Sequence, residues 1–310
     1  MGLQLPRLSA AKPAKVRRSA ALIAMGITVL ALGGCSSATT DEWKRAAMPE
    51  PISNQGERIL GLWQGAWIAA MITGVVVWAL IFYVIVRYRR RSDDEIPVQT
   101  RYNLPLEIFY TIAPVIMVIV FFAHTVKTQN YILDDDLPVD NTIEVVGQQW
   151  SWTFNYGLGE MDAAANDDAA DDEFPYKSYV HGGGTGSQIP DLYLPVDQTT
   201  RFNLHSPDVI HDLGVPAFLM KMDVIPGRVN HYEVTPTVIG TYKGKCFELC
   251  GVYHSRMLFN VHVVSQEDYQ AYLQQLEDSG ATSELPLLGG DYASTQTGLQ
   301  SGDESQEGAE

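Results

Sequence analysis

The chain has 310 residues, 46% of them hydrophobic, and a formal net charge of −16 at pH 7. This length allows one or two domains with a sizeable core. The negative charge argues against nucleic acid as a partner because phosphate would repel it; it favours solubility or a basic partner instead. Apolar residues concentrate before Lys127 and acidic residues after it, so the average composition conceals two segments of different character.

Residues 1–34 have the pattern of an export signal. A positive segment containing Arg17 and Arg18 precedes an apolar stretch over 20–32, which is the length of a signal-peptide core. Two glycines then lead into Cys35 and two serines, a pattern that resembles a bacterial lipobox. The resemblance implies a lipoprotein, cleaved before Cys35 and carrying a diacylglyceryl thioether on its sulfur. The alternative is an uncleaved signal anchor with an unused cysteine.

Two apolar stretches follow, over Ile59–Val86 and Leu106–Ala123. The first carries no charge and exceeds the ~20 residues needed to cross a bilayer; the second is shorter and contains Glu107 near its start. A basic cluster over 87–91 lies between them, which places that loop in the cytoplasm. The sequence therefore predicts a transmembrane helical hairpin over 59–128. Residues 35–58 and everything after the hairpin are then extracytoplasmic.

The next predicted domain covers 129–278 and is rich in short β-strands. Turn-forming residues separate runs of β-branched and aromatic residues, at Thr142–Val146, Asp191–Leu194, Thr200–Leu204, Val229–Val234 and Leu258–Val264. Such a pattern indicates an antiparallel β-sandwich or barrel. Ser265 is the expected N-cap of a short helix over Tyr269–Leu276. An acidic surface insertion is predicted at about 157–187, and a disordered acidic tail at 279–310.

One stretch of this domain concentrates metal-binding side chains. Cys246, Cys250, His254 and Met257 lie within about a dozen residues, a span that one loop can wrap around an ion. Thiolate and thioether sulfurs are soft ligands that favour copper. Zinc is the main chemical rival, although its sites rarely recruit methionine. A disulfide between the two cysteines is the structural alternative.

With Ser206–His211 upstream, this stretch resembles subunit II of the haem–copper cytochrome c oxidases. The resemblance covers about Ile59 to Leu276 and rests on a Cys-x-Glu-x-Cys-x3-His-x2-Met motif preceded by an Asp-Val-x-His segment. It implies a cupredoxin-like sandwich that binds a binuclear copper centre, Cu(A).

Carried onto this sequence, the resemblance implies that Cys246 and Cys250 bridge two copper ions. His211 and His254 would each bind one copper, and Met257 and the backbone carbonyl of Glu248 would be weak ligands. His205 competes with His211 for the first histidine position, but its strand context suggests an ordinary strand residue.

Three further roles rest on the resemblance alone. Trp150 matches the residue at which electrons enter from cytochrome c, whereas its residue type alone favours a core position. The Glu248 side chain resembles a ligand of a magnesium ion at the boundary with subunit I. Glu107 matches the carboxylate at the mouth of a proton pathway, and its alternative is an interfacial acid beside a membrane helix.

The implied function is to accept electrons from cytochrome c, or from a cytochrome c domain in a supercomplex, and to pass them to haem in subunit I. That partner and other oxidase subunits would form a proton-translocating oxidoreductase in the bacterial plasma membrane. The acidic insertion is expected near the donor surface, where it would shape docking. Two alternatives are a thioredoxin-like copper chaperone, which would alternate strands and helices, and a copper-free quinol-oxidase subunit, which would lack the cysteines and histidines.

Overall fold

A computed structural model of the chain describes residues 37–92, 96, 99–133, 138–162, 174–184 and 188–289. Its contacts divide the chain into two units, Met1–Met48 and Pro49–Glu310. In the first unit the structure describes one helix, α2 (Ser37–Lys44). The predicted export signal and Cys35 lie outside the described residues, so the lipoprotein interpretation stays a prediction.

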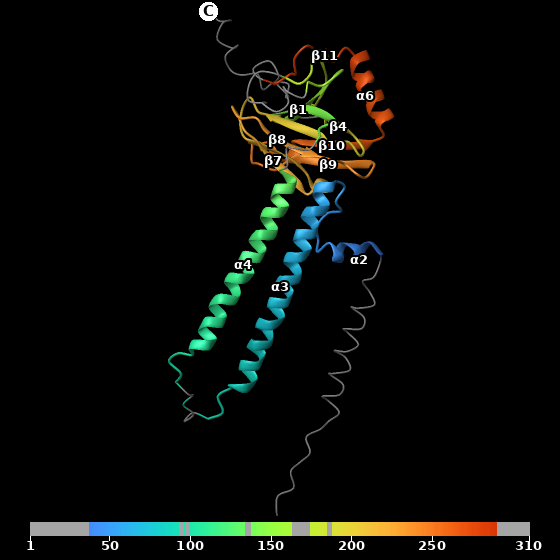
Figure 1. The fold of residues 1–310 in the computed structure, drawn as a ribbon. Coiled ribbons are helices and arrows are strands. Elements are labelled where there is room, and N and C mark those ends of the chain that lie inside the picture. Colours follow the sequence, from blue (N-terminus) through green and yellow to red (C-terminus); the bar gives the residue numbers. More distant parts are fainter. Residues whose placement is uncertain are drawn as a thin grey trace, which may run out of the picture. The chain divides into compact units, whose positions relative to one another are not determined.

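Two long helices open the second unit, α3 (Asn54–Arg87) and α4 (Leu104–Ile132). Both are long and apolar enough to cross a membrane, and they run side by side (Figure 1). The guanidinium of Arg58, early in α3, lies 4.7 Å from the ring centroid of Tyr131, late in α4. The helices are therefore antiparallel, which confirms the predicted hairpin.

The second helix is longer than the apolar stretch that predicted it. Its first turn is capped by Asn103, whose side chain accepts a hydrogen bond from the Leu106 amide. Its last residue is Ile132, so the predicted domain boundary at residue 129 falls inside a helix and was too early. Polar residues of the last turns extend the helix beyond its apolar run because backbone hydrogen bonding does not depend on side-chain polarity.

The segment before α3 is hydrogen bonded to the β-rich part of the unit. The Ile52 amide donates to the Ala217 carbonyl at 3.0 Å, and the Thr237 amide donates to the Ile52 carbonyl at 2.8 Å. The Gln55 side chain accepts from the Thr235 amide at 3.2 Å. Two backbone hydrogen bonds before α3 and one side-chain hydrogen bond in its first turn thus join the start of this helix to the sandwich.

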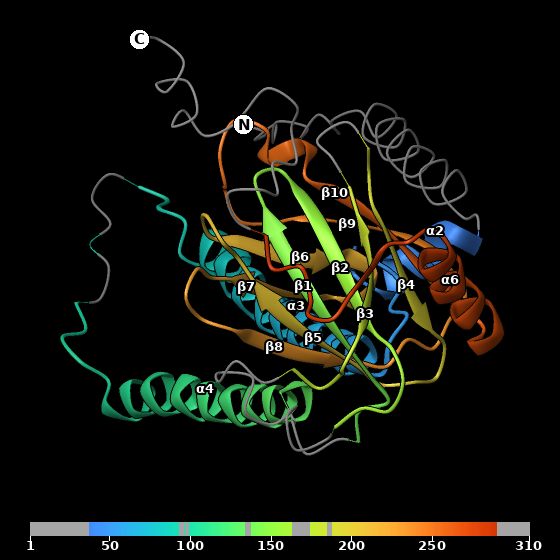
Figure 2. The same cartoon turned by 90° about the horizontal axis from the view of Figure 1, so that it is seen from above.

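Two sheets build the rest of the unit (Figures 1 and 2). The six-stranded sheet has the order β11–β3–β2–β1–β5–β8, formed by Thr282–Ser283, Tyr179–Gly183, Ser151–Gly157, Asn141–Gln148, Thr200–His205 and Asn230–Val234. The five-stranded sheet has the order β4–β10–β9–β6–β7, formed by Asp191–Pro195, Leu258–Val264, Gly240–Cys246, His211–Val215 and Met220–Val224. Short 3-10 turns lie at Pro216–Phe218 (η1) and His254–Arg256 (η2).

Every predicted strand is present, and the sandwich prediction is confirmed. The pairing is antiparallel except for β1 with β5 and β10 with β4, which are parallel. Helix α6 (Gln266–Asp278) follows β10, with Ser265 accepting from the Asp268 amide as the predicted N-cap.

Two sequence boundaries need correction. Strand β3 lies inside the range predicted as an insertion, and its Tyr179 and Val180 are fully buried. Strand β11 lies inside the predicted disordered tail. Both segments are ordered because they add to an existing sheet edge, where main-chain hydrogen bonds form whatever the side chains are.

An aromatic cluster fills the space between the sheets. Phe259 lies at the centre of it, with ring centroids 5.6 Å from Trp152 and 5.5 Å from Phe154. All three side chains have no exposed surface. Phe259 also lies so close to Gly244 on the paired strand that a Cβ there would approach its ring to 2.0 Å.

Replacing Phe259 with alanine should lower the free energy of unfolding by about 3–5 kcal/mol because it leaves a large cavity in the core. Urea denaturation of the detergent-solubilised chain, followed by tryptophan emission, measures this change. Ile239→Ala is the matched control: Ile239 is 61% exposed, and its loss should cost no more than about 0.5 kcal/mol. Equal effects of the two substitutions would contradict this description of the core.

Candidate metal centre

The predicted ligands converge through the pairing of three strands. Strand β9 ends at Cys246 and β10 begins at Leu258, so the cysteine-rich segment is the connection between two antiparallel neighbours. The Cys246 amide donates to the Met257 carbonyl at 3.0 Å, which closes the two ends of this connection. On the other side β9 pairs with β6, with Leu213 opposite Cys246. That register brings His211, the first residue of β6, beside the loop.

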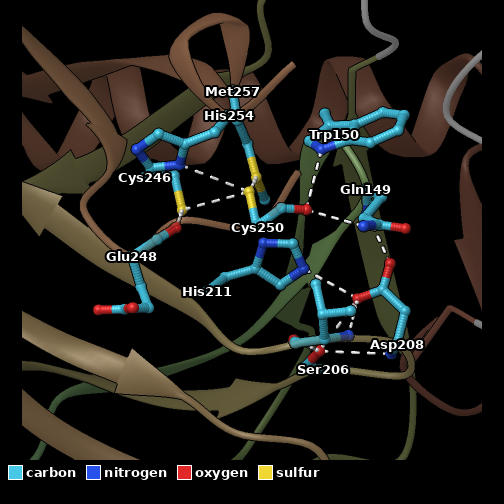
Figure 3. Close-up of polar contacts among 11 residues, drawn as sticks. Gln149, Trp150, Ser206, Asp208, His211, Cys246, Glu248, Cys250, His254 and Met257 are labelled. Carbon is cyan, nitrogen blue, oxygen red and sulfur yellow. Dashed lines mark hydrogen bonds and ion pairs between the residues drawn. The ribbon is translucent and has the colours of Figure 1, made fainter. Parts of the chain in front are cut away.

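The donor atoms of the loop face one another (Figure 3). The Cys246 and Cys250 sulfurs are 3.8 Å apart. His254 Nδ1 lies 3.5 Å from the Cys250 sulfur, and the Met257 sulfur lies 3.8 Å from it. One ring nitrogen of His211 and the two cysteine sulfurs all lie within 4.8 Å of one another.

This donor set fits a soft metal ion. Both cysteines are free thiols in the structure, so the disulfide alternative does not describe this state. The Nδ1 atom of His211 is buried without a hydrogen-bond partner among the described residues, and a buried polar atom of this kind calls for a partner such as an ion. Sulfur-rich ligation with a thioether favours copper over zinc.

An outer pair of residues holds the ligands in place. The Asp208 carboxylate lies 2.8 Å from His211 Nε2 and accepts the Gln149 amide at 2.7 Å. The Gln149 side chain in turn donates to the Cys250 carbonyl at 2.7 Å. Through these bonds His211 and Cys250 are fixed relative to each other, and Asp208 leaves Nδ1 of His211 as its free nitrogen. Sequence reasoning assigned no role to either outer residue.

The electrostatics of the cluster favour a bound cation. Burial would lower the pKa of His211, but the hydrogen bond that its ring donates to the Asp208 carboxylate and the nearby Cys246 sulfur raise it overall. Burial would raise the pKa of the Cys246 thiol, yet its contacts with His211 and neighbouring backbone groups lower it. Burial, followed by the charge of Cys246, raises the pKa of Cys250 to about 12. Two adjacent thiolates therefore repel each other unless a positive ion lies between them.

Trp150 contacts the loop directly and is half-buried. Its ring nitrogen donates to the Cys250 carbonyl at 3.1 Å, and its ring packs edge-on against Tyr253 with centroids 5.0 Å apart. Gly251 has φ +126, and a Cβ there would approach the Trp150 ring to 3.0 Å. The loop thus requires glycine at this position, both for its backbone conformation and for its close packing on the tryptophan.

The competing histidine lies elsewhere. His205 Nε2 is 2.6 Å from a carboxylate oxygen of Glu144, whose other oxygen accepts from Asn203 at 2.9 Å. Glu144 is buried and His205 is partly exposed. Glu144 lies between the core residues Ile143 and Val145 on β1, so the pair lies on the face of the six-stranded sheet opposite to the core. The structure brings His211, and not His205, to the cysteines.

The two predicted carboxylates have different surroundings. The backbone carbonyl of Glu248 lies 3.2 Å from the Cys246 sulfur, while its side chain belongs to an exposed residue. Glu107 accepts a hydrogen bond from the Asn103 amide at 2.9 Å, so in this structure it caps the first turn of α4. Glu107 thus lies in the first turn of the second membrane helix, and its role in a proton pathway stays a prediction.

The acidic insertion begins away from the centre. Met161 and Tyr176, from its first and second described stretches, lie at the start of β1: the Thr142 amide donates to the Tyr176 hydroxyl, and the Thr142 Oγ contacts the Met161 sulfur. Strand β2 separates this end of the sheet from Trp150, and its length corresponds to ~20 Å. The later described residues return along β2, and the Gly184 amide donates to the Trp152 carbonyl at 3.2 Å, two residues from Trp150. That the insertion lies near the donor surface stays a prediction; residues 163–173 and 185–187 lie outside the described part.

Family models match both halves of the chain. A model described as the periplasmic domain of cytochrome c oxidase subunit II matches residues 141–264, and one described as the transmembrane domain of the same subunit matches residues 41–127. The probable cytochrome c oxidase subunit 2 of Streptomyces avermitilis is 44% identical over 281 residues, covering 84% of this chain and 87% of the relative. The cytochrome c oxidase subunit 2 of Mycobacterium tuberculosis H37Rv is 33% identical, covering 90% and 87%.

A solved structure is also similar, that of the periplasmic domain of subunit II of cytochrome oxidase from Bradyrhizobium japonicum. It is 27% identical, with a TM-score of 0.36, and covers 46% of this chain and 97% of that chain. The family that matches 141–264 is the Cu(A)-binding one, and the matched range contains His211 and the cysteine-rich loop. The chain therefore belongs to the cytochrome c oxidase subunit II family, and it is the subunit at which electrons enter a terminal oxidase.

Proposed function

We propose that the chain accepts electrons from cytochrome c at a binuclear copper centre and delivers them to haem in subunit I, where oxygen is reduced to water. The observation that carries the proposal is the convergence of His211 with Cys246 and Cys250 within 4.8 Å. Cys246 and Cys250 would bridge the two ions, and His211 and His254 would each bind one. Met257 and the Glu248 carbonyl would be weak ligands.

When bound, the copper pair supplies a one-electron carrier whose charge is spread over two metals. The chain's contribution is to hold the ligands in nearly the same positions in both oxidation states. Asp208 fixes the His211 ring, and Gln149 and Trp150 both bond to the Cys250 carbonyl. Ligands held by packing and outer hydrogen bonds reorganise little, which favours fast electron transfer.

Trp150 is the proposed point at which electrons enter. Its ring is half-buried, so one part can contact a donor while the indole nitrogen reaches the metal loop. The donor would be a soluble cytochrome c or a cytochrome c domain of a supercomplex. The acidic composition of the chain, with a net charge of −16, would attract a basic donor surface.

Further roles are proposed for two carboxylates and for the membrane anchor. The exposed Glu248 side chain would bind magnesium at the boundary with subunit I, while the backbone carbonyl of the same residue would bind copper. Glu107 would lie at the mouth of a proton pathway. The basic cluster after α3 would keep the helix-connecting loop in the cytoplasm, so the copper domain would lie outside the bacterial plasma membrane. Cys35 would carry the lipid.

The same substitution at two histidines tests the ligand assignment. His211→Gln removes a proposed ligand, so copper affinity should fall by more than the roughly 10–100-fold that changes to outer-shell residues cost. His205→Gln is the matched control because an amide can still donate to Glu144. Copper content after competition with a chelator, together with the visible spectrum, measures both. The assignment fails if the control loses the spectrum while His211→Gln keeps it.

Trp150→Phe tests the entrance for electrons. Copper content should be unchanged, while the rate of electron transfer from reduced cytochrome c should fall at least ~10-fold, equivalent to about 1.4 kcal/mol of barrier. Stopped-flow oxidation of the cytochrome by the assembled oxidase gives this rate. Trp78→Phe, on α3, is the control and should leave the rate unaltered. An unchanged rate in the Trp150 variant would exclude this residue as the entrance.

A further inference from the structure

A segment of nine residues that follows helix α6 runs back across the sandwich. This segment, residues 281–289, is called the C-terminal strap here; Figure 2 shows it in red, crossing the six-stranded sheet. Sequence composition placed it in a disordered tail. Its path over the sheet can be followed contact by contact.

The strap begins at the β3 edge. The Ala281 carbonyl accepts from the His181 amide at 3.0 Å, and Thr282 and Ser283 pair antiparallel with β3 as strand β11. These main-chain bonds fix the start of the strap without any contribution from its side chains.

Asn155 of β2 then holds the later part of the strap. Its side chain accepts from the Leu287 amide at 2.8 Å and donates to the Leu287 carbonyl at 3.1 Å. The same amide group also donates to the Glu144 carbonyl of β1 at 3.0 Å. Asn155 has no exposed surface, and a fully buried amide is retained only where its hydrogen bonds are satisfied. It acts as a clip between strap and sheet.

The strap ends beside the metal centre's outer residues. Gly289 has φ +80, and a Cβ there would lie 2.6 Å from the Gln148 side-chain oxygen and 2.9 Å from Pro207. Those two residues directly precede Gln149 and Asp208, which are bonded to each other at 2.7 Å. Gln149 holds the Cys250 carbonyl, and Asp208 holds His211.

We propose that the C-terminal strap is a positioning element of the metal centre. Held by Asn155, the strap packs against the turns that carry Gln149 and Asp208 and stabilises the hydrogen bond between them. This bond in turn fixes the positions of His211 and Cys250 relative to each other. The strap acts on the ligands through Gln149 and Asp208. The inference rests on the proposed copper function for its effect on the metal, but its effect on the Gln149 amide does not depend on metal.

A pair of glycine substitutions tests the proposal in the full chain. Gly289→Ala places a methyl group against Gln148 and Pro207. Gly280→Ala is the matched control because Gly280 has a similar φ of +78, with nothing within 4 Å of its Cβ. Hydrogen exchange of the Gln149 amide in the metal-free chain should be about tenfold faster in Gly289→Ala than in the control. Amides of β9 and β10 should exchange at the same rate in both.

Metal binding provides the second readout. Copper affinity of Gly289→Ala should fall roughly 10-fold, within the range typical of outer-shell changes, and its visible spectrum should shift; Gly280→Ala should match the unsubstituted chain. Two truncations repeat the comparison: a chain ending at Gly290 keeps the strap and should behave as full length, whereas one ending at Gly280 should behave as Gly289→Ala.

Equal Gln149 exchange in the two glycine variants would overturn the proposal, as would identical copper affinity. If the chain ending at Gly280 does not fold, the glycine pair decides alone. Failure of the unsubstituted chain to bind a copper pair would refute the proposed function instead, and the exchange experiment would still judge the strap.

Discussion

The metal centre depends on the pairing of β9 with its two neighbours. Cys246 ends β9, and its amide bonds to the carbonyl of Met257 just before β10, which makes the ligand-rich segment a closed loop. The register of β9 with β6 places Leu213 opposite Cys246, which in turn places His211 at the mouth of that loop. A shift of one residue in either pairing would turn a ligand to the opposite face of the sheet. The aromatic cluster around Phe259 holds this register by packing the two sheets together.

The buried cluster is stable only as a unit with its outer residues. Thiolates in a buried site are costly unless a cation compensates them, and a histidine ring in the same place needs its other nitrogen satisfied. Asp208 provides that second contact, and Gln149 connects it to the loop. Asp208 and Gln149 therefore keep the ligand geometry constant while the charge of the bound metal changes.

Local motifs made part of this predictable. Cys246, Cys250, His254 and Met257 lie in one loop, so their spacing alone indicates a metal site. His211 is distant in sequence, and the family resemblance, together with the strand context of His205, singled it out. Asp208 and Gln149 come from two different turns that meet only in the folded sheet. Their polar side chains look like ordinary loop residues, and no periodicity marks them.

The membrane hairpin was also predictable because hydrophobic length and charge bias report directly on the bilayer. The ordered structure of strand β3 and of the strap was not predictable from the sequence. Strand β3 ends in two glycines, and the strap mixes polar residues, proline and leucines without a strand period. Strand β3 is ordered by pairing with β2, and the strap by pairing with β3 and by Asn155. The role of Asn155 was equally hard to predict. Asparagine is typical of turns, yet Asn155 lies fully buried in a central strand, where its side chain holds the strap.

The most direct test of the central claim is the copper stoichiometry and electron paramagnetic resonance of the oxidised, full-length chain purified with copper. We expect two copper ions per chain and one unpaired electron shared equally between two copper nuclei. One copper ion with a localised electron, or zinc retained in preference to copper, would contradict it.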